Sequence, residues 1–241
     1  MNINEGKKKR AQKVVIYGAE GIGKTTLAAQ FPDPLILDLE DGSAMMDVKR
    51  VDDIRTWNQL GDALKEIIED PSICRTLVID TADKAEQMCT TAVCQEKGVK
   101  GIEDIGYGKG YTYVAEKMAA FCSYLSLIVR KGVNVVVIAH AQMRKFEQPD
   151  EMGAYDRWEL KLSKKAAPLF KEWADMLLFL NYKTDVAVTS NGKAKATGGR
   201  RVVYASHHPC WDAKNRHGLP DMFDLDYEIL KPIFEEDETN E

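Results

Sequence analysis

The sequence has no run of about 18 apolar residues, which is the length that a membrane-spanning helix needs. Residues 1–13 are polar, and the basic stretch over residues 7–10 leads into a strand-like segment and not into the apolar core of a signal peptide. We therefore expect a protein of the cytoplasm with no membrane partner. At 241 residues, of which 44% are hydrophobic, the chain can bury one substantial core.

The chain also lacks paired cysteines. Its five cysteines are odd in number and form no C-x-x-C motif, which argues against a disulfide framework and against a zinc site. We predict reduced and mostly buried thiols at Cys74, Cys89, Cys94, Cys122 and Cys210.

A strong excess of one charge is missing too. The net charge is −5, yet five acids lie within the last seven residues, so the charge of the rest of the chain is −5 + 5 = 0. A neutral body can still carry a basic face. We predict a flexible basic N-terminus over residues 1–12, one folded domain over 13–232 and an acidic tail over 233–241. The tail is either a solvated end or an arm that competes with a polyanion for the basic face.

What the sequence does contain is a complete phosphate-binding pattern near its start. The motif G-x-x-x-x-G-K-[ST] follows a β-branched run over residues 14–17 that predicts a buried strand, and it leads into a predicted helix. Such a strand-loop-helix turn directs several backbone N–H groups at one point, where the phosphates of a nucleotide bind. Lys24 would reach the β- and γ-phosphates, and the Thr25 hydroxyl would ligate magnesium. The predicted nucleotide-binding residues are Gly18, Ala19, Glu20, Gly21, Ile22, Gly23, Lys24, Thr25 and Thr26.

Further strands and helices alternate along the chain. Strands are predicted at 34–40, 76–80, 133–139, 174–182 and 200–206, and helices at 54–69, 82–97, 114–132 and 163–173. This alternation predicts an α/β fold with a mostly parallel sheet and helices on both faces. Ligands of such sheets bind at the carboxyl ends of the strands, where Lys24, Glu40, Asp80 and His140 fall. Asp80 is predicted to hold the magnesium ion, directly or through water.

Missing motifs narrow the choice of nucleotide and of reaction. No N-K-x-D or T-K-x-D motif for reading guanine is present, since the nearest stretch, residues 181–185, carries an extra residue, so adenine is favoured. Asp80 is followed by Thr81, so the AAA-type pair of adjacent acids is missing, and Glu40 is predicted to orient the attacking water instead. A small-molecule kinase is disfavoured because no lid with phosphate-binding arginines follows the 133–139 strand.

Three stretches resemble the RecA family of ATPases. They are Asp38-Leu39-Glu40, the apolar strand before His140, and Trp211-Asp212-Ala213-Lys214-Asn215-Arg216-His217-Gly218-Leu219-Pro220. Their order over residues 13–232 is similar to that of the phage-type RecA-like ATPases that act as single-strand annealing recombinases. The resemblance implies a RecA-like P-loop NTPase fold, with His140 as the γ-phosphate sensor and Gln142 as the alternative. It also implies that Lys214 and Arg216 act in trans on ATP held by a neighbouring subunit of a ring or filament, where an arginine contributes on the order of 10³ to 10⁵ in rate.

The same resemblance places two loops on DNA, a glycine-rich one over residues 98–113 and a non-periodic one over 143–159. Cations there would neutralise phosphates, and aromatic side chains would stack on unpaired bases. The predicted DNA-binding residues are Lys100, Lys109, Tyr111, Arg144, Lys145 and Trp158, and a third cationic segment with Lys193, Lys195, Arg200 and Arg201 could join the same face. Alternatively, the aromatic side chains pack on the domain and the cations are solvated.

The prediction from the sequence is an ATP-dependent, single-stranded-DNA-binding recombinase or annealing protein that hydrolyses ATP with Mg²⁺ at subunit interfaces. Its partners would be single-stranded DNA, further copies of the chain and a single-strand binding protein. The alternative is an ATP-binding switch or loader that acts on a protein partner without direct DNA contact.

Overall fold

The computed structural model describes residues 5–6, 10–147, 153–188 and 194–235. Lys193, most of the predicted acidic tail and part of the predicted basic N-terminus lie outside these described ranges.

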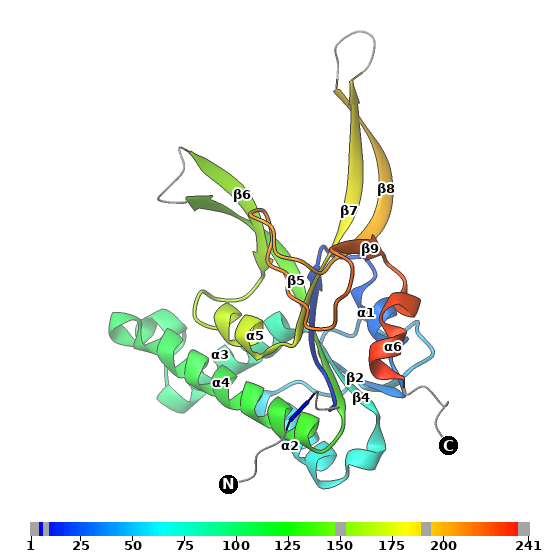
Figure 1. Ribbon diagram of the computed structural model, residues 1–241. Helices are drawn as coiled ribbons and strands as arrows, with labels where there is room; N and C mark the ends of the chain where they lie inside the picture. The colour runs from blue at the N-terminus through cyan, green and yellow to red at the C-terminus, as the bar shows by residue number, and fades with distance from the viewer. Residues whose placement is uncertain (1–4, 7–9, 148–152, 189–193, 236–241) are drawn as a thin grey trace, which may run out of the picture.

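One mixed sheet runs through the centre of the protein (Figure 1). Its strands lie in the order β3-β2-β4-β5-β1-β7-β8-β9, and β6 pairs with β5 off this path. The pairings from β3 to β7 are parallel, whereas β6, β8 and β9 run antiparallel to their neighbours. The strands are β1 (Lys13–Gly18), β2 (Pro34–Asp38), β3 (Lys49–Val51), β4 (Thr76–Asp80), β5 (Asn134–Glu147), β6 (Ala154–Leu160), β7 (Met176–Val188), β8 (Ala194–Tyr204) and β9 (Met222–Asp224).

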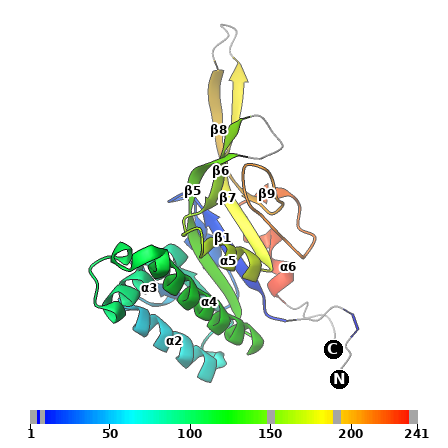
Figure 2. The ribbon, with the colours of Figure 1, turned by 90° about the vertical axis from the view of Figure 1, so that its left-hand side faces the viewer.

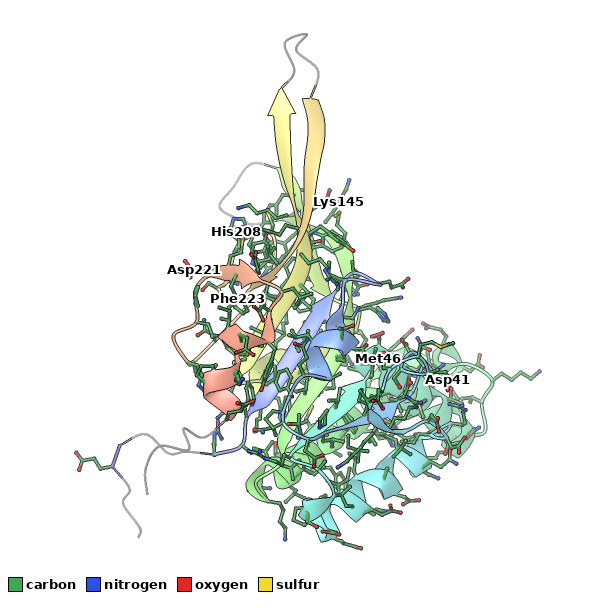
Figure 3. The ribbon with its side chains drawn as sticks, turned by 90° about the vertical axis from the view of Figure 1, so that its right-hand side faces the viewer. Asp41, Met46, Lys145, His208, Asp221 and Phe223 are labelled. Carbon is green, nitrogen blue, oxygen red and sulfur yellow. The ribbon has the colours of Figure 1, made fainter. Side chains whose placement is uncertain are left out.

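Helices cover both faces of the sheet. Figure 2 shows the face with α2 (Trp57–Glu69), α3 (Ala82–Lys97), α4 (Lys109–Arg130) and α5 (Ala167–Trp173), and Figure 3 the side with α1 (Lys24–Ala28) and α6 (Lys231–Phe234). Alternate residues of β1 divide between two apolar cores. Val15 and Tyr17 pack in the larger core, under α2 to α5, whereas Val14 and Ile16 pack in the core under α1 and α6. The predicted α/β fold, with a mostly parallel sheet and helices on both faces, is confirmed.

Local signals set the ends of these helices. Thr56 and Gln59 form a reciprocal capping box at the start of α2. The Thr81 side chain accepts the backbone N–H of Lys84 at the start of α3, and Gly98, with φ 64°, ends that helix in the left-handed region. Short 3-10 segments fill several connections: η1 (Pro71–Ile73), η2 (Ile102–Asp104), η3 (Gly106–Gly108) and η4 (Tyr227–Ile229).

The predicted irregular loop over residues 98–113 is wrong in its second half, because α4 begins at Lys109. The glycine at position 110 misled the prediction, since glycine is rare inside helices. Here it permits close packing: a Cβ at Gly110 would lie 2.6 Å from the Ile102 carbonyl oxygen.

The predicted loop over residues 143–159 is also wrong, because β5 runs to Glu147 and β6 returns beside it. Inward and outward side chains do alternate along these strands. The sequence hides this alternation, because the inward positions include the cations Arg144 and Arg157. The hairpin is held by ring contacts: Phe146 and Tyr155 lie 5.6 Å apart across the strands, and the Arg157 guanidinium lies 5.1 Å from the centre of the Phe146 ring.

Two hairpins therefore project beyond the carboxyl edge of the parallel sheet (Figure 1). β5 is level with the end of β1 at His140 and continues into the β5–β6 hairpin. β7 is level with the same point at Leu180 and continues to Val188 in the β7–β8 hairpin, so both late strands are longer than predicted. Both hairpins rise from the edge at which β1 leads into the phosphate-binding motif.

The structure bears on two further predictions, which concern the cysteines and a membrane-spanning helix. All five cysteines are free, four are buried and Cys210 is half-buried, so the prediction that the thiols are mostly buried is confirmed. Within the described ranges, no helix combines the length and the apolar character that crossing a membrane requires.

Candidate active site

The phosphate-binding motif folds as the loop between β1 and α1, as predicted. Each of its three glycines is required by the backbone. Gly21 and Gly23 have φ values of 69° and 106°, which side chains rarely adopt. A Cβ at Gly18 would lie 2.4 Å from the Leu180 carbonyl oxygen on β7. The loop is thus a tight cradle of backbone groups that fits the phosphates of a nucleotide.

Lys24 lies across this cradle with a side chain that is almost fully buried. Its Nζ donates hydrogen bonds to the carbonyl oxygens of Gly18 (3.2 Å) and Ala19 (2.8 Å). Burial lowers the pKa of the ammonium, and the nearby carboxylates of Asp80 and Asp83 oppose that shift. A nucleotide's phosphate oxygens would be stronger partners than the two carbonyls, because both partners would then be charged.

Thr25 and Asp80 form the pair that could hold magnesium. The Thr25 hydroxyl, at the start of α1, donates a hydrogen bond of 2.7 Å to Oδ2 of Asp80, at the end of β4. Both groups offer oxygen ligands, which suit Mg²⁺. Asp80 is only 5% exposed, and burial raises its pKa to about 6. Magnesium, when bound there, would supply positive charge beside the phosphates.

Glu40 is presented by a turn that Asp38 builds. The buried Asp38 carboxylate accepts hydrogen bonds from the backbone N–H groups of Glu40 (3.2 Å), Gly42 (3.0 Å) and Ser43 (2.7 Å), and from the Ser43 hydroxyl (2.6 Å). Burial alone would raise the pKa of Asp38, but these hydrogen bonds outweigh it and leave the pKa below its ordinary value. Asp38 is therefore a structural residue, and Glu40 is the exposed carboxylate. The Thr81 hydroxyl lies 3.1 Å from Glu40 Oε1.

His140 is held by Asp83, a residue that the sequence analysis missed. Asp83 Oδ1 accepts the backbone N–H of His140 at 3.0 Å, and Oδ2 lies 2.6 Å from His140 Nδ1. The hydrogen bond to Asp83 raises the pKa of His140. Burial alone would raise the pKa of Asp83, but its hydrogen bonds with His140 outweigh burial and lower it. The pair favours an imidazolium whose Nδ1 is engaged and whose Nε2 is the atom that can donate elsewhere.

Only the sheet register reveals the role of Asp83. In the sequence it follows Thr81 in the first turn of α3, where an acid is ordinary. Asp80 lies level with Ile138 on β5, which brings the start of α3 beside His140. The Thr81 hydroxyl lies 3.1 Å from Asp83 Oδ2 as well as from Glu40, so it links the two acids.

The donor atoms of Glu40, Asp83 and His140 lie within 4.8 Å of one another, which is close enough for a shared metal ion. However, Asp83 already engages Nδ1 of the histidine. The donor set of Thr25 and Asp80 fits Mg²⁺ better, because it is made of oxygen atoms at the phosphate loop. Gln142, the alternative sensor, is turned away: its amide donates to the carbonyl oxygens of Leu160 (2.9 Å) and Leu162 (3.4 Å).

Lys214 and Arg216 lie away from this site, toward the amino end of the sheet. Lys214 pairs through its backbone with Leu177 near the start of β7, and its Nζ donates to the Lys171 carbonyl oxygen at 2.7 Å. Arg216 forms a 3.1 Å ion pair with the buried Asp175, yet 60% of its side chain is exposed. Neither cation lies beside the phosphate loop of its own chain. Action in trans requires such a separation, because the cation would act on the nucleotide of a neighbouring subunit.

The predicted DNA-binding residues fall into three groups. Tyr111 and Arg144 line one cleft of about 570 Å³ between α3, the start of α4 and β5, and Asp83 and Gln142 line the same cleft. Trp158 packs its ring 6.0 Å from that of Phe179 on the sheet. The remaining three, Lys100, Lys109 and Lys145, are exposed, and Figure 3 marks Lys145 on the projecting part of β5.

The third cationic segment belongs to the β7–β8 hairpin. Lys195 lies on β8, and Arg200 forms an ion pair of 3.1 Å with Asp224. Arg201, the next residue, lies instead beside the phosphate loop, with Nη1 at 3.5 Å from the Ile22 carbonyl oxygen.

The chain is similar to several known proteins. The sequence profile of a family described as "AAA domain" matches residues 10–217. The SPbeta prophage-derived uncharacterized protein YorG of Bacillus subtilis strain 168 is 25% identical over 134 residues, which are 53% of this chain and 40% of that protein. The chain thus aligns with less than half of that relative. The crystal structure of the KaiC-like protein PH0186 of Pyrococcus horikoshii OT3 is similar with a TM-score of 0.46 and 13% identity, over 87% of this chain and 81% of that one.

Proposed function

From the premise that this chain belongs to the AAA domain family, we propose that it is an ATP-dependent recombinase or annealing protein that binds single-stranded DNA. It would hydrolyse ATP at the interfaces of a RecA-like ring or filament. The prophage origin of the relative YorG supports a phage setting for this activity. A single-strand binding protein that supplies the DNA would be a further partner.

The chemistry follows from the side chains at the loop. Lys24 would bind the phosphates, and Glu40 would accept a proton from the water that attacks the terminal phosphorus. The bond to the bridging oxygen then breaks, which gives ADP and phosphate. His140 would donate from Nε2 to the terminal phosphate while Asp83 holds Nδ1. Glu40 would orient the attacking water in place of the second acid of an AAA-type pair, which is missing next to Asp80. Its contact with Thr81 keeps it at the site.

The observation that carries the DNA proposal is the cleft beside the sensor. Tyr111 and Arg144 offer a ring and a cation inside it, which suits a base and a phosphate of a single strand. Asp83 lines the same cleft and also bonds to His140. An occupant of the cleft would therefore touch a group that positions the sensor, so DNA binding and hydrolysis would affect each other.

The β7–β8 hairpin adds positive charge at the same edge of the sheet. Its projecting strands, residues 181–188 and 194–201, carry three cations and one acid besides Arg201, which lies at the phosphate loop. Such an excess attracts a polyanion in a salt-dependent manner. The projecting strands of the β5–β6 hairpin, residues 141–147 and 154–160, carry three cations and three acids. That neutral hairpin is what favours the second candidate, an ATP-binding switch or loader that docks on a protein.

ATP hydrolysis measured with and without a single-stranded oligonucleotide, at about 50 and 200 mM salt, separates the two candidates. The recombinase proposal expects DNA to stimulate hydrolysis and expects the stimulation to weaken at the higher salt. Arg144→Ala should reduce DNA affinity, whereas Lys65→Ala, on the far layer at α2, should not. A hydrolysis rate that DNA does not change, together with no salt-dependent DNA binding, would refute the recombinase proposal. The ATP-binding switch or loader would then remain as the candidate.

A further inference from the structure

Arg201 of β8 contacts the phosphate loop from outside the motif. Its Nη1 lies 3.5 Å from the Ile22 carbonyl oxygen. A Cβ added at Gly23 would lie 3.0 Å from the same Nη1 and 3.1 Å from Leu225 Cδ2. The space beside Gly23 is thus filled by a guanidinium and by Leu225, whose backbone N–H donates to the Arg201 carbonyl oxygen at 3.1 Å. This contact is built by three segments that are far apart in the sequence.

The strand geometry explains why Arg201, and not Arg200, reaches the loop. Successive side chains of a strand point to opposite faces of the sheet. Val203, two residues along β8, packs in the core under α1 and α6, so Arg201 lies on that face as well. Arg200 lies on the other face and pairs with Asp224.

The surroundings of Arg201 favour the binding of an anion. Lys24, the cation of the motif itself, is buried, and its Nζ donates to two carbonyl oxygens. Across the residues that the structure places, Arg201 forms no ion pair, in contrast to Arg200. A guanidinium without a carboxylate partner can bind a negative ligand, with hydrogen bonds that are stronger than those to a carbonyl oxygen. A nucleotide's phosphates are such a ligand, and the loop is their cradle.

We infer that Arg201 is a nucleotide-binding residue, which contacts the phosphate chain of a nucleotide held in the loop of its own subunit. A guanidinium can donate two parallel hydrogen bonds to phosphate oxygens. The inference depends on nucleotide binding at the loop and not on the DNA-binding part of the proposed function. Arg201 would then belong to the ATP site and not to the cationic DNA face that the sequence suggested.

The test is direct titration of the full chain with ADP and with a non-hydrolysable ATP analogue, in the presence of Mg²⁺ and without DNA. Arg201→Ala should weaken both ligands about tenfold, the loss that follows removal of one charge-assisted hydrogen bond. Arg201→Lys should lie between the wild type and the alanine variant, because it keeps the charge but loses the fork. Arg200→Ala removes an equal charge from the opposite face and should change neither affinity by more than about twofold.

Equal affinities for the wild type and Arg201→Ala would overturn the inference, as would an equal loss in Arg200→Ala. A variant that weakens only the binding of an oligonucleotide would assign Arg201 to DNA instead, and would also overturn it. Thermal unfolding checks that the alanine variant is folded. If it is not, the lysine variant decides: an unchanged affinity in Arg201→Lys refutes a forked contact. If DNA binding fails in every variant while the tenfold loss is found, the inference holds and the recombinase proposal falls.

Discussion

Replacing Asp80 by asparagine should make the protein more stable while it removes a magnesium ligand. The carboxyl of Asp80 is 5% exposed, and burial raises its pKa to about 6 from an ordinary 3.8. At neutral pH the folded protein must therefore keep a carboxylate ionised where burial disfavours the charge. Asparagine has nearly the same shape and can still accept the hydrogen bond from Thr25, but it carries no charge.

The size of the effect follows from the shift in pKa. A difference of about two pKa units corresponds to about 3 kcal/mol, at about 1.4 kcal/mol for each unit. We expect Asp80→Asn to recover about 1 to 3 kcal/mol, which is a rise in Tm of roughly 3 to 10 °C for a chain of this length.

The sign of the pH dependence is equally specific. Between the ordinary pKa and the raised one, the folded protein holds a proton that the unfolded chain has released. The stability of the wild type therefore falls as the pH rises from about 4 to about 6, and it changes no further above that through this group. The advantage of Asp80→Asn should be small near pH 4 and complete by about pH 7.

Thermal or urea unfolding in EDTA, at several pH values, measures this effect, and a second series with Mg²⁺ and ATP measures ligand binding. Mg²⁺ with ATP should stabilise the wild type much more than Asp80→Asn, which should lose most of its hydrolysis. Asp62→Asn, an exposed acid on α2, serves as the matched control. A drop in stability in Asp80→Asn at pH 7 in EDTA, or an advantage that is the same at pH 4 and pH 7, would show that burial does not govern this carboxyl.

Two further predictions concern turnover. Asp83→Asn should lower kcat about tenfold or more and move the alkaline limb of the pH–rate profile to lower pH, because His140 loses the carboxylate that raises its pKa; an unmoved limb would mean that the histidine does not titrate in the reaction. Arg216→Ala should lose hydrolysis and regain about a quarter of the wild-type rate in an equal mixture with Lys24→Ala, since one interface in four then combines an intact loop with an intact arginine; a mixture that stays as inactive as its components argues against action across an interface.

The sequence was sufficient for the elements whose polarity matches their place in the fold. The predicted strand at 76–80 and the predicted helix at 82–97 have the bounds of β4 and α3. Both have an apolar pattern that agrees with burial, and Thr81 marks their junction. The phosphate loop was equally clear, because each of its glycines has a steric reason.

The rest depended on contacts between distant segments. The β5–β6 hairpin was missed because Arg144 and Arg157 occupy inward positions that normally hold apolar residues, so the period of two was hidden. Asp83 looked like an ordinary helix-start acid until the register of β4 and β5 placed it against His140. Arg201 looked like one of several surface cations until β8 brought it to Gly23. In each case a local pattern was compatible with more than one role, and the tertiary contact selected between them.

The same register separates the two cations proposed to act in trans. Asp175, which anchors Arg216, precedes by five residues the Leu180 that lies level with Gly18, a distance of roughly 16 Å along an extended strand. An arginine side chain cannot span that distance, so Arg216 does not reach the phosphates of its own chain. Lys214 is also remote, but its ammonium is committed to the Lys171 carbonyl oxygen and its backbone to Leu177. Arg216, with 60% of its side chain exposed, is therefore the cation that a neighbouring subunit could meet, and Lys214 is the residue that holds the turn carrying it.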